Sequence, residues 1–221
     1  MRIRHHASLG LAATACLVLS GCTNAADWNA NRSSQIHSFD TSSIQAQPDI
    51  IAKLPQGALE DGVLDVAAST DYAPAEFLDP SGTAVGYDVD LTNAIAAVLG
   101  VKGKVHTAEF DSIIASIGSK YDAGISSFTV TPERTAEVDM TAYINVGSRF
   151  NVQAGNPKDV ETSDHLKLCG RTIGVQVGTA QETTMRDAAD KCAQAGKPVL
   201  SVRSYSKQSE ATTGLVGGTI D

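Results

Sequence analysis

Segments patterned as buried strands alternate with segments patterned as helices along most of this chain, and this alternation restricts its fold more than any other feature. A strand pattern over Val63–Ala68 is followed by an amphipathic helix over Asp90–Leu99, whose apolar residues recur at helical spacing. A strand over Lys104–Thr107, a helix over Ser112–Ser119 and a strand over Asp122–Ser126 come next. This order predicts a parallel sheet with helices on its faces.

A second unit of the same kind begins after Gly155-Asn156-Pro157. Its predicted elements are a strand, a helix, a strand and a helix, over Arg171–Gln176, Gly178–Ala195, Pro198–Val202 and Ser206–Val216. An extended stretch, Arg149–Ala154, joins the two units. The predicted fold class is therefore α/β with two lobes. Ligands of such sheets bind at the carboxyl ends of the strands, which here would line a cleft between the lobes.

The composition narrows the classes of function. The chain has 221 residues, of which 42% are hydrophobic, so it can bury a substantial core. Its formal net charge of −8 argues against a protein that wraps nucleic acid, because that function needs clustered Lys and Arg. His37, His106 and His165 are scattered without ligand spacing. We therefore expect no metal site and no cofactor.

The N-terminus has the pattern of an export signal. Arginines precede an apolar run, Leu9–Leu19, that is too short to span a bilayer. The run ends in Leu19-Ser20-Gly21-Cys22, which resembles a bacterial lipobox, in which the cysteine is acylated with diacylglycerol and the leader is cut before it. We predict a signal peptide over residues 1–21 and a lipid anchor on Cys22. An ordinary secretory leader is the alternative.

The rest of the chain divides by composition. Residues 22–57 are rich in Asn, Ser, Ala, Gln and Asp with little periodicity, which predicts a flexible tether. Lobe 1 is expected over residues 58–150 and lobe 2 over residues 151–221.

The cysteines sort by position. Cys16 belongs to the leader and Cys22 would carry lipid, which leaves Cys169 and Cys192 as an even pair. In an exported, oxidising setting such a pair predicts a disulfide. Two buried free thiols are the alternative.

The segment from Ser126 to Arg134 combines groups that suit a free amino acid. Such a ligand needs a cation for its carboxylate and acceptors for its ammonium. The guanidinium of Arg134 can make two parallel charge-assisted bonds, and Thr131-Pro132 would start the short helical turn that carries it. Ser127 can offer a carbonyl, and Thr129 a hydroxyl and an N–H group. Considered without further context, an arginine in this position is more often a surface residue.

Several motifs resemble one family in order and spacing. Gly86-Tyr87-Asp88-Val89-Asp90-Leu91 is similar to the signature of the family 3 extracellular solute-binding proteins, which have the type 2 periplasmic-binding-protein fold. The other matching landmarks are Ser69–Pro74, Glu109–Asp111, Ser126–Arg134 and Gly178–Gln181. The resemblance covers roughly residues 58–221. Within the signature, Asp88 and Asp90 are expected to cap the helix that follows rather than to bind ligand.

The resemblance implies a set of ligand-binding residues. Arg134 matches the arginine that binds the ligand carboxylate and Thr129 matches its partner, while Ser126 and Ser127 match the position that meets the ammonium. Tyr72 and Phe110 match two aromatic residues that enclose the ligand side chain, although plain core packing is the alternative for both. In lobe 2, Thr179, Ala180 and Gln181 match donors at a helix N-terminus.

The function implied by the resemblance is that of a receptor for an ABC importer. It would bind a free polar L-amino acid as a monomer and deliver it to the permease subunits, without catalysis. An enzyme of the same fold, such as a dehydratase of a prephenate-like acid, and a sensing module of a larger protein are the alternatives. In the family an acid of lobe 2 and a closing segment of lobe 1 follow the position of Asp221. The resemblance therefore predicts a C-terminally incomplete chain with weak binding of its own.

Overall fold

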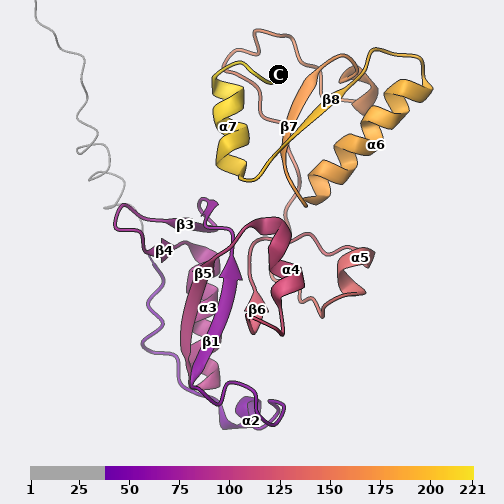
Figure 1. The fold of residues 1–221 in the computed structure, drawn as a ribbon. Helices are drawn as coiled ribbons and strands as arrows, with labels where there is room; N and C mark the ends of the chain where they lie inside the picture. The colour runs from indigo at the N-terminus through magenta and orange to yellow at the C-terminus, as the bar shows by residue number, and fades with distance from the viewer. Residues whose placement is uncertain (1–37) are drawn as a thin grey trace, which may run out of the picture. The chain divides into compact units, whose positions relative to one another are not determined.

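A parallel sheet of three strands, in the order β5-β1-β6, forms the centre of the first predicted unit (Figure 1). The computed structural model describes residues 38–221, so the predicted leader and Cys22 lie outside the described residues. In the sheet, β1 (Val63–Ala68) pairs on one side with β5 (Lys102–Thr107) and on the other with β6 (Ala123–Gly124). The bounds of β1 are those predicted, because a continuous apolar run between polar flanks is typical of a buried parallel strand.

The two faces of this sheet are covered by different helices. Leu64 and Val66 are buried against Ala96 of α3 (Tyr87–Leu99), whereas Ala67 is buried with Ile113 of α4 (Ile113–Ser116). This division follows from the alternation of side chains along a strand. The parallel α/β unit predicted from the sequence is therefore confirmed.

Two predicted elements of this unit are shorter than expected. The helix predicted over Ser112–Ser119 is instead a 3₁₀ turn, η1 (Phe110–Ser112), followed by α4, because Ile117 is already extended and Gly118 has a φ of 77°. The strand predicted over Asp122–Ser126 is reduced to β6. A small antiparallel sheet formed by β2 (Asp71–Tyr72), β3 (Glu76–Leu78) and β4 (Ala84–Val85) was not predicted.

The second predicted unit contains two parallel strands, β7 (Thr172–Gln176) and β8 (Ser201–Tyr205). The flanking helices are η2 (His165–Lys167), α6 (Ala180–Gln194) and α7 (Gln208–Val216). The prediction placed the second strand three residues too early, at Pro198–Val202. Proline has no N–H to donate to a ladder, and pairing begins only at Ser201.

The largest apolar cluster of the described residues lies in this unit, and its eight buried members are Val160, Leu168, Ile173, Val175, Met185, Ala188, Cys192 and Leu200. The structure contains the predicted disulfide between Cys169 and Cys192, whose Cα atoms are 5.7 Å apart. It joins the segment before β7 to the buried face of α6. We refer to residues 58–150 as the N-terminal region and to residues 151–221 as the C-terminal region.

The end of the predicted tether contains ordered structure. A short helix, α2 (Pro48–Ile51), follows Gln47, whose N–H donates to the carbonyl of Val98 at 2.9 Å. The N–H of Phe39 donates to Oδ2 of Asp90 at 2.8 Å. Residues 38–51 thus contact α3. Within residues 38–221, no helix is long and apolar enough to cross a membrane.

Candidate ligand-binding site

The Ser126–Ser127 turn follows β6 at its carboxyl end, and both hydroxyls point into the protein. Oγ of Ser126, which is 3% exposed, donates to Oε1 of Glu76 at 2.5 Å and accepts the N–H of Ser69 at 3.0 Å. Oγ of Ser127 donates to Oδ2 of Asp88 at 3.2 Å. Both hydroxyls are therefore engaged in hydrogen bonds within the protein, and the backbone groups of the turn make none of these contacts.

Arg134 is carried by the short helix α5 (Pro132–Thr135), which begins where the sequence predicts. Its N-cap, Thr131, accepts the N–H of Arg134 on its hydroxyl. The guanidinium donates from Nη1 to the carbonyl of Thr129 at 2.7 Å and from Nη2 to the carbonyl of Gly178 at 2.9 Å. Burial lowers the pKa of Arg134. An arginine nevertheless stays charged at neutral pH, so the site presents a cation.

Two aromatic rings lie beneath this cation. Phe110 and Phe128 stack with their ring centroids 4.5 Å apart, and the guanidinium lies 5.7 Å from the first and 5.2 Å from the second. Phe110 is buried, whereas Tyr72 on β2 is 46% exposed. Phe128 was not among the predicted site residues. Its position within the Ser126–Arg134 segment was the available signal.

The predicted site residues of the C-terminal region lie at the N-terminus of α6. Thr179 is the N-cap: its hydroxyl accepts the N–H of Glu182 at 3.1 Å and donates to the carbonyl of Gln176 at 2.7 Å. Ala180 begins the helix, and Nε2 of Gln181 donates to Oγ of Ser148 at 2.7 Å. A helix N-terminus carries free N–H groups and a partial positive charge, which suit a carboxylate.

The structure brings Arg134 and this helix terminus together. Gly178, whose carbonyl accepts Nη2 of Arg134, directly precedes Thr179. A Cβ atom on Gly178 would lie 2.7 Å from Cβ of Asp111, so glycine is required for this approach. Two further contacts join the same regions. Nε2 of Gln176 donates to Oγ of Ser69 at 3.4 Å, and Oδ2 of Asp71 accepts both the N–H and the hydroxyl of Ser209, at 3.1 and 3.0 Å.

Glu182 holds the Gly178 turn from inside. Its carboxylate accepts the N–H of Gly178 at 2.8 Å, the hydroxyl of Ser204 at 2.6 Å and Nη2 of Arg186 at 2.6 Å. Burial opposes its ionisation, but the hydrogen bonds from these three groups together lower the pKa of Glu182. Glu182 is therefore an anion at neutral pH.

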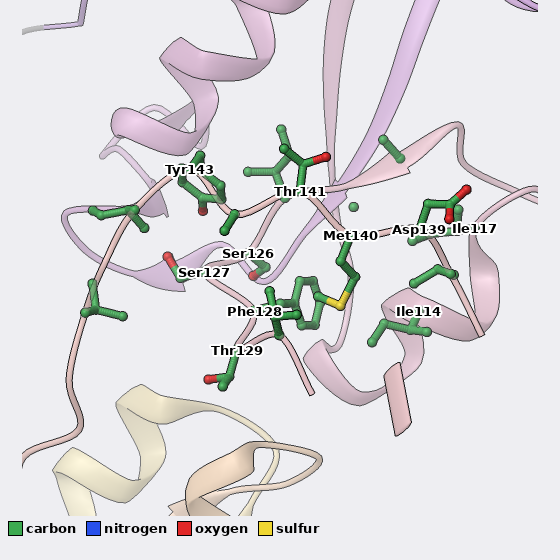
Figure 2. A pocket seen from close by; sticks show the side chains of 18 of the residues that line it. Ile114, Ile117, Ser126, Ser127, Phe128, Thr129, Asp139, Met140, Thr141 and Tyr143 are labelled. Carbon is green, nitrogen blue, oxygen red and sulfur yellow. The ribbon is translucent and has the colours of Figure 1, made fainter. Parts of the chain in front are cut away.

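A cavity of about 410 Å³ lies beside the Ser126–Ser127 turn. Of the predicted site residues, Ser126, Ser127 and Thr129 line it, and the segment from Val138 to Val146 contributes much of the remaining wall. Figure 2 shows residues of both segments along the cavity. No group of three or more His, Cys, Asp or Glu side chains suited to a metal occurs in the described part of the chain.

The expected caps of α3 are not formed. Its N-cap is Gly86, which has no side chain, and no side-chain hydrogen bond caps the helix. The carboxylate of Asp88 accepts the hydroxyl of Tyr143 at 2.8 and 2.9 Å, and that of Asp90 accepts the N–H of Phe39. Both acids lie in the first helical turn, where they still complement its positive end.

Comparison with known proteins defines the class. The model of the bacterial extracellular solute-binding proteins, family 3, matches residues 64–213, so the chain belongs to this family. The arginine-binding protein ArgT of Corynebacterium glutamicum is 31% identical over 218 residues, which are 97% of this chain and 68% of that protein. The L-arginine-binding protein of Pseudomonas aeruginosa is 33% identical over 77% of this chain and 63% of its own length. The L-cystine-binding protein TcyJ of Escherichia coli is 33% identical over 58% of this chain and 48% of its own length.

Solved structures agree with the family. An ancestral arginine-binding protein bound to arginine superposes with a TM-score of 0.61 and 32% identity, over 72% of this chain and 68% of that one. An ancestral amino-acid-binding protein described as a precursor of cyclohexadienyl dehydratase gives a TM-score of 0.65 and 29% identity, over 74% of this chain and 70% of that one. The chain therefore has the α/β architecture of the type 2 periplasmic-binding proteins. Membership in an extracellular family also makes it an exported protein.

Proposed function

We propose that this chain is the substrate-binding receptor of an ABC importer and that it binds a free polar L-amino acid without transforming it. The observation that carries the proposal is the position of Arg134. Its guanidinium lies on a stacked aromatic pair and contacts the turn that opens α6. A planar cation next to helix N–H groups suits a carboxylate.

In this proposal the ligand binds between lobe 1 (residues 58–150) and lobe 2 (residues 151–221). Its carboxylate contacts Arg134 and the N–H groups at Thr179–Gln181, and its ammonium contacts backbone carbonyls of the Ser126–Ser127 turn. Thr129, Phe110 and Tyr72 complete the site. The existing hydrogen bonds between the regions support a closed arrangement of this kind.

L-Arginine is the first ligand to test. The relatives from Corynebacterium glutamicum and Pseudomonas aeruginosa are named for binding arginine, and L-cystine is the second choice because of the relative from Escherichia coli. The remaining common amino acids form the panel against which selectivity is measured.

Calorimetry with wild type, Arg134→Ala and Arg134→Lys tests the proposal. We expect Arg134→Ala to lose about 2–5 kcal/mol of binding free energy, or roughly 30- to several-thousand-fold in affinity, because the ligand carboxylate loses a desolvated charged partner. Arg134→Lys should also bind poorly, since an ammonium cannot make two parallel bonds. Arg149→Ala removes an exposed arginine and is the matched control. Equal affinities of wild type and Arg134→Ala would contradict the assignment.

Membrane anchoring through Cys22 and delivery to permease subunits complete the proposal. A Cys22→Ser variant should leave the membrane fraction, because acyl chains contribute about 0.8 kcal/mol per buried CH₂ group. Equal retention of this variant would contradict the anchor.

The similarity to a dehydratase precursor makes an enzyme the second candidate. A dehydratase needs a general acid that reaches its substrate. Burial raises the pKa of Glu76 to about 9, so this side chain is protonated at neutral pH. It is only 1% exposed, however, so a substrate cannot reach its proton. This burial favours the binding protein over the enzyme.

A further inference from the structure

Two buried acids lie behind the Ser126–Ser127 turn. Glu76 is on β3 and Asp88 is in the first turn of α3, and each is 1% exposed. Glu76 accepts the hydroxyl of Ser126, and Asp88 accepts the hydroxyl of Ser127. Each of two neighbouring serines is therefore held by one acid, and the two acids come from different elements.

The backbone brings these two acids together. The N–H of Tyr87 donates to the carbonyl of Pro74 at 3.2 Å, and that of Asp88 donates to the carbonyl of Ala75 at 2.9 Å. Gly86 permits this approach, because a Cβ atom there would lie 2.2 Å from the carbonyl oxygen of Ala75. The start of α3 is thus fixed against the residues that precede Glu76.

The acids share a site that favours one proton. Burial raises the pKa of Glu76 to about 9; the hydrogen bond from Ser126 opposes this rise, while the charge of Asp88, a hydrogen bond with Asp88 and the charge of Asp71 add to it. The charged groups that act on Glu76 are therefore both acids. Tyr143 faces Asp88 from the segment after α5, and burial raises its pKa, so it remains a neutral donor.

One atom of Glu76 has an evident role in this arrangement. Oε2 is buried and, among the described residues, is the buried side-chain atom that accepts no hydrogen bond. A protonated Oε2 is a donor instead, and the carboxylate of Asp88 is an acceptor. A carboxylic acid beside a carboxylate satisfies both groups with one proton.

We propose that Glu76 and Asp88 act as a hydrogen-bonded acid pair that positions the Ser126–Ser127 turn for the amino-acid ligand. The turn needs such support because Ser127 has a φ of 50°, a left-handed conformation that costs a residue other than glycine energy. Both acids are positioning residues, since they act through the serines. The inference rests on the proposed function, which assigns the backbone of this turn to the ligand.

Glu76→Gln and Glu76→Met separate hydrogen bonding from charge. The amide of Gln can accept from Ser126 and donate to Asp88, so we expect an L-arginine affinity within about threefold of wild type. Met preserves volume but loses both bonds, and we expect an affinity at least about tenfold weaker. Glu60→Gln, which changes an exposed glutamate of the same region, is the control. An unchanged affinity of Glu76→Met would overturn the positioning role.

The pH dependence of unfolding tests the proton itself. The folded protein keeps a proton on Glu76 that the unfolded chain releases, so the stability due to this group is lost as pH rises from about 4.5 towards 9. In this window the unfolding constant of wild type should rise by up to about tenfold per pH unit relative to Glu76→Gln. Glu60→Gln should keep the wild-type slope. Equal slopes for wild type and Glu76→Gln would show that Glu76 carries no proton.

Amide hydrogen exchange tests the acid pair without relying on ligand binding. If wild type binds no amino acid, the proposed function fails, whereas the pair is still judged by exchange at the N–H of Ser69, which donates to Ser126. Ser126→Ala removes the hydroxyl that accepts this N–H and that donates to Glu76, without altering either acid, and should expose the amide as Glu76→Met does. An exchange rate unchanged in Ser126→Ala would overturn the inference even if Glu76→Met failed to fold.

Discussion

Glu76 in the N-terminal region and Glu182 in the C-terminal region are 1% and 9% exposed, yet their pKa values shift in opposite directions. Burial penalises the charged form of both carboxyls. Glu182 receives bonds from a backbone N–H, a hydroxyl and a guanidinium, and these donors outweigh burial. Glu76 receives one hydroxyl and faces Asp88, so burial prevails. The partners of a buried acid thus decide its charge.

The same contrast separates the two regions. In the C-terminal region an apolar cluster of eight buried residues and a disulfide maintain the fold, and Glu182 braces one turn at its edge. In the N-terminal region the apolar clusters each have three buried residues, and a polar network reaches the interior. We therefore expect the stability of the N-terminal region to depend on close backbone approach and on protonation. The stability of the C-terminal region should depend on its disulfide and on ionic hydrogen bonds.

The largest effect is expected from Gly86→Ala in the N-terminal region. Gly86 has φ 122° and ψ 171°, a combination nearly restricted to glycine, and its Cβ would lie 2.2 Å from a backbone oxygen. We expect a loss of at least about 3 kcal/mol in the free energy of unfolding, measured by denaturant titration. Gly82→Ala is the control, because a Cβ there meets nothing within 4 Å and only backbone strain remains. Similar losses for both variants would contradict the role of close approach.

Removal of the disulfide should have the next largest effect and should act in the C-terminal region. Cys169 and Cys192 are 23 residues apart, and opening a loop of that size costs about 3 kcal/mol in the chain-entropy model. The double Cys→Ser variant should show faster amide exchange in α6 and β7, with β1 little changed. A uniform increase across both regions would mean that they unfold as one unit.

Glu182→Gln should destabilise the C-terminal region by about 2 kcal/mol at pH 7, because it weakens charge-assisted hydrogen bonds. The folded pKa of Glu182 is lowered, so its stabilisation is present above the unfolded value, near 4.5, and is lost as pH falls through the folded pKa. Stability measured from pH 3 to pH 7 should converge for wild type and variant at the acidic end. Asp187→Asn, an exposed change on the same helix, is the control. A constant difference at all pH values would contradict an ionic role.

Long helices and strands were predicted more accurately from the sequence than short ones. Apolar runs such as Val63–Ala68 and the periodic pattern of α3 identified long elements, because many residues contribute to each signal. The strands of the small sheet have two or three residues, too few for alternation to be visible. The strand predicted over Asp122–Ser126 ends at Gly124, and the left-handed conformation of Ser127 beyond it is accompanied by a tertiary contact with Asp88 that no local pattern indicates.

The candidate site was predictable where a local motif carries it. Arg134 on a turn capped by Thr131 follows from Thr131-Pro132-Glu133-Arg134 alone. The contacts of Ser126 with Glu76 and of Ser127 with Asp88 span 50 and 39 residues, and no local pattern indicates them. A glutamate between Ala75 and Phe77 on a short strand gives no sign that it is buried. Only the folded structure shows that these polar side chains share one interior.

The smallest effect is expected from Thr179→Ala at the N-cap of α6. The variant loses the acceptor for the N–H of Glu182, which should cost about 1 kcal/mol, or a fall in Tm of roughly 2–4 °C. Gly86 caps α3 without a side chain, so α3 offers no equivalent bond to remove and its stability depends on the close backbone approach instead. Thr183→Ala, one turn further along α6, is the matched control. It removes an exposed threonine and replaces it with a better helix former, so its Tm should stay the same or rise. A fall in Tm shared by both variants would mean that threonine at either position stabilises α6 in the same way. The side-chain cap of α6 would then add no stability of its own, and the contrast with α3, which has no side-chain cap, would have no energetic basis.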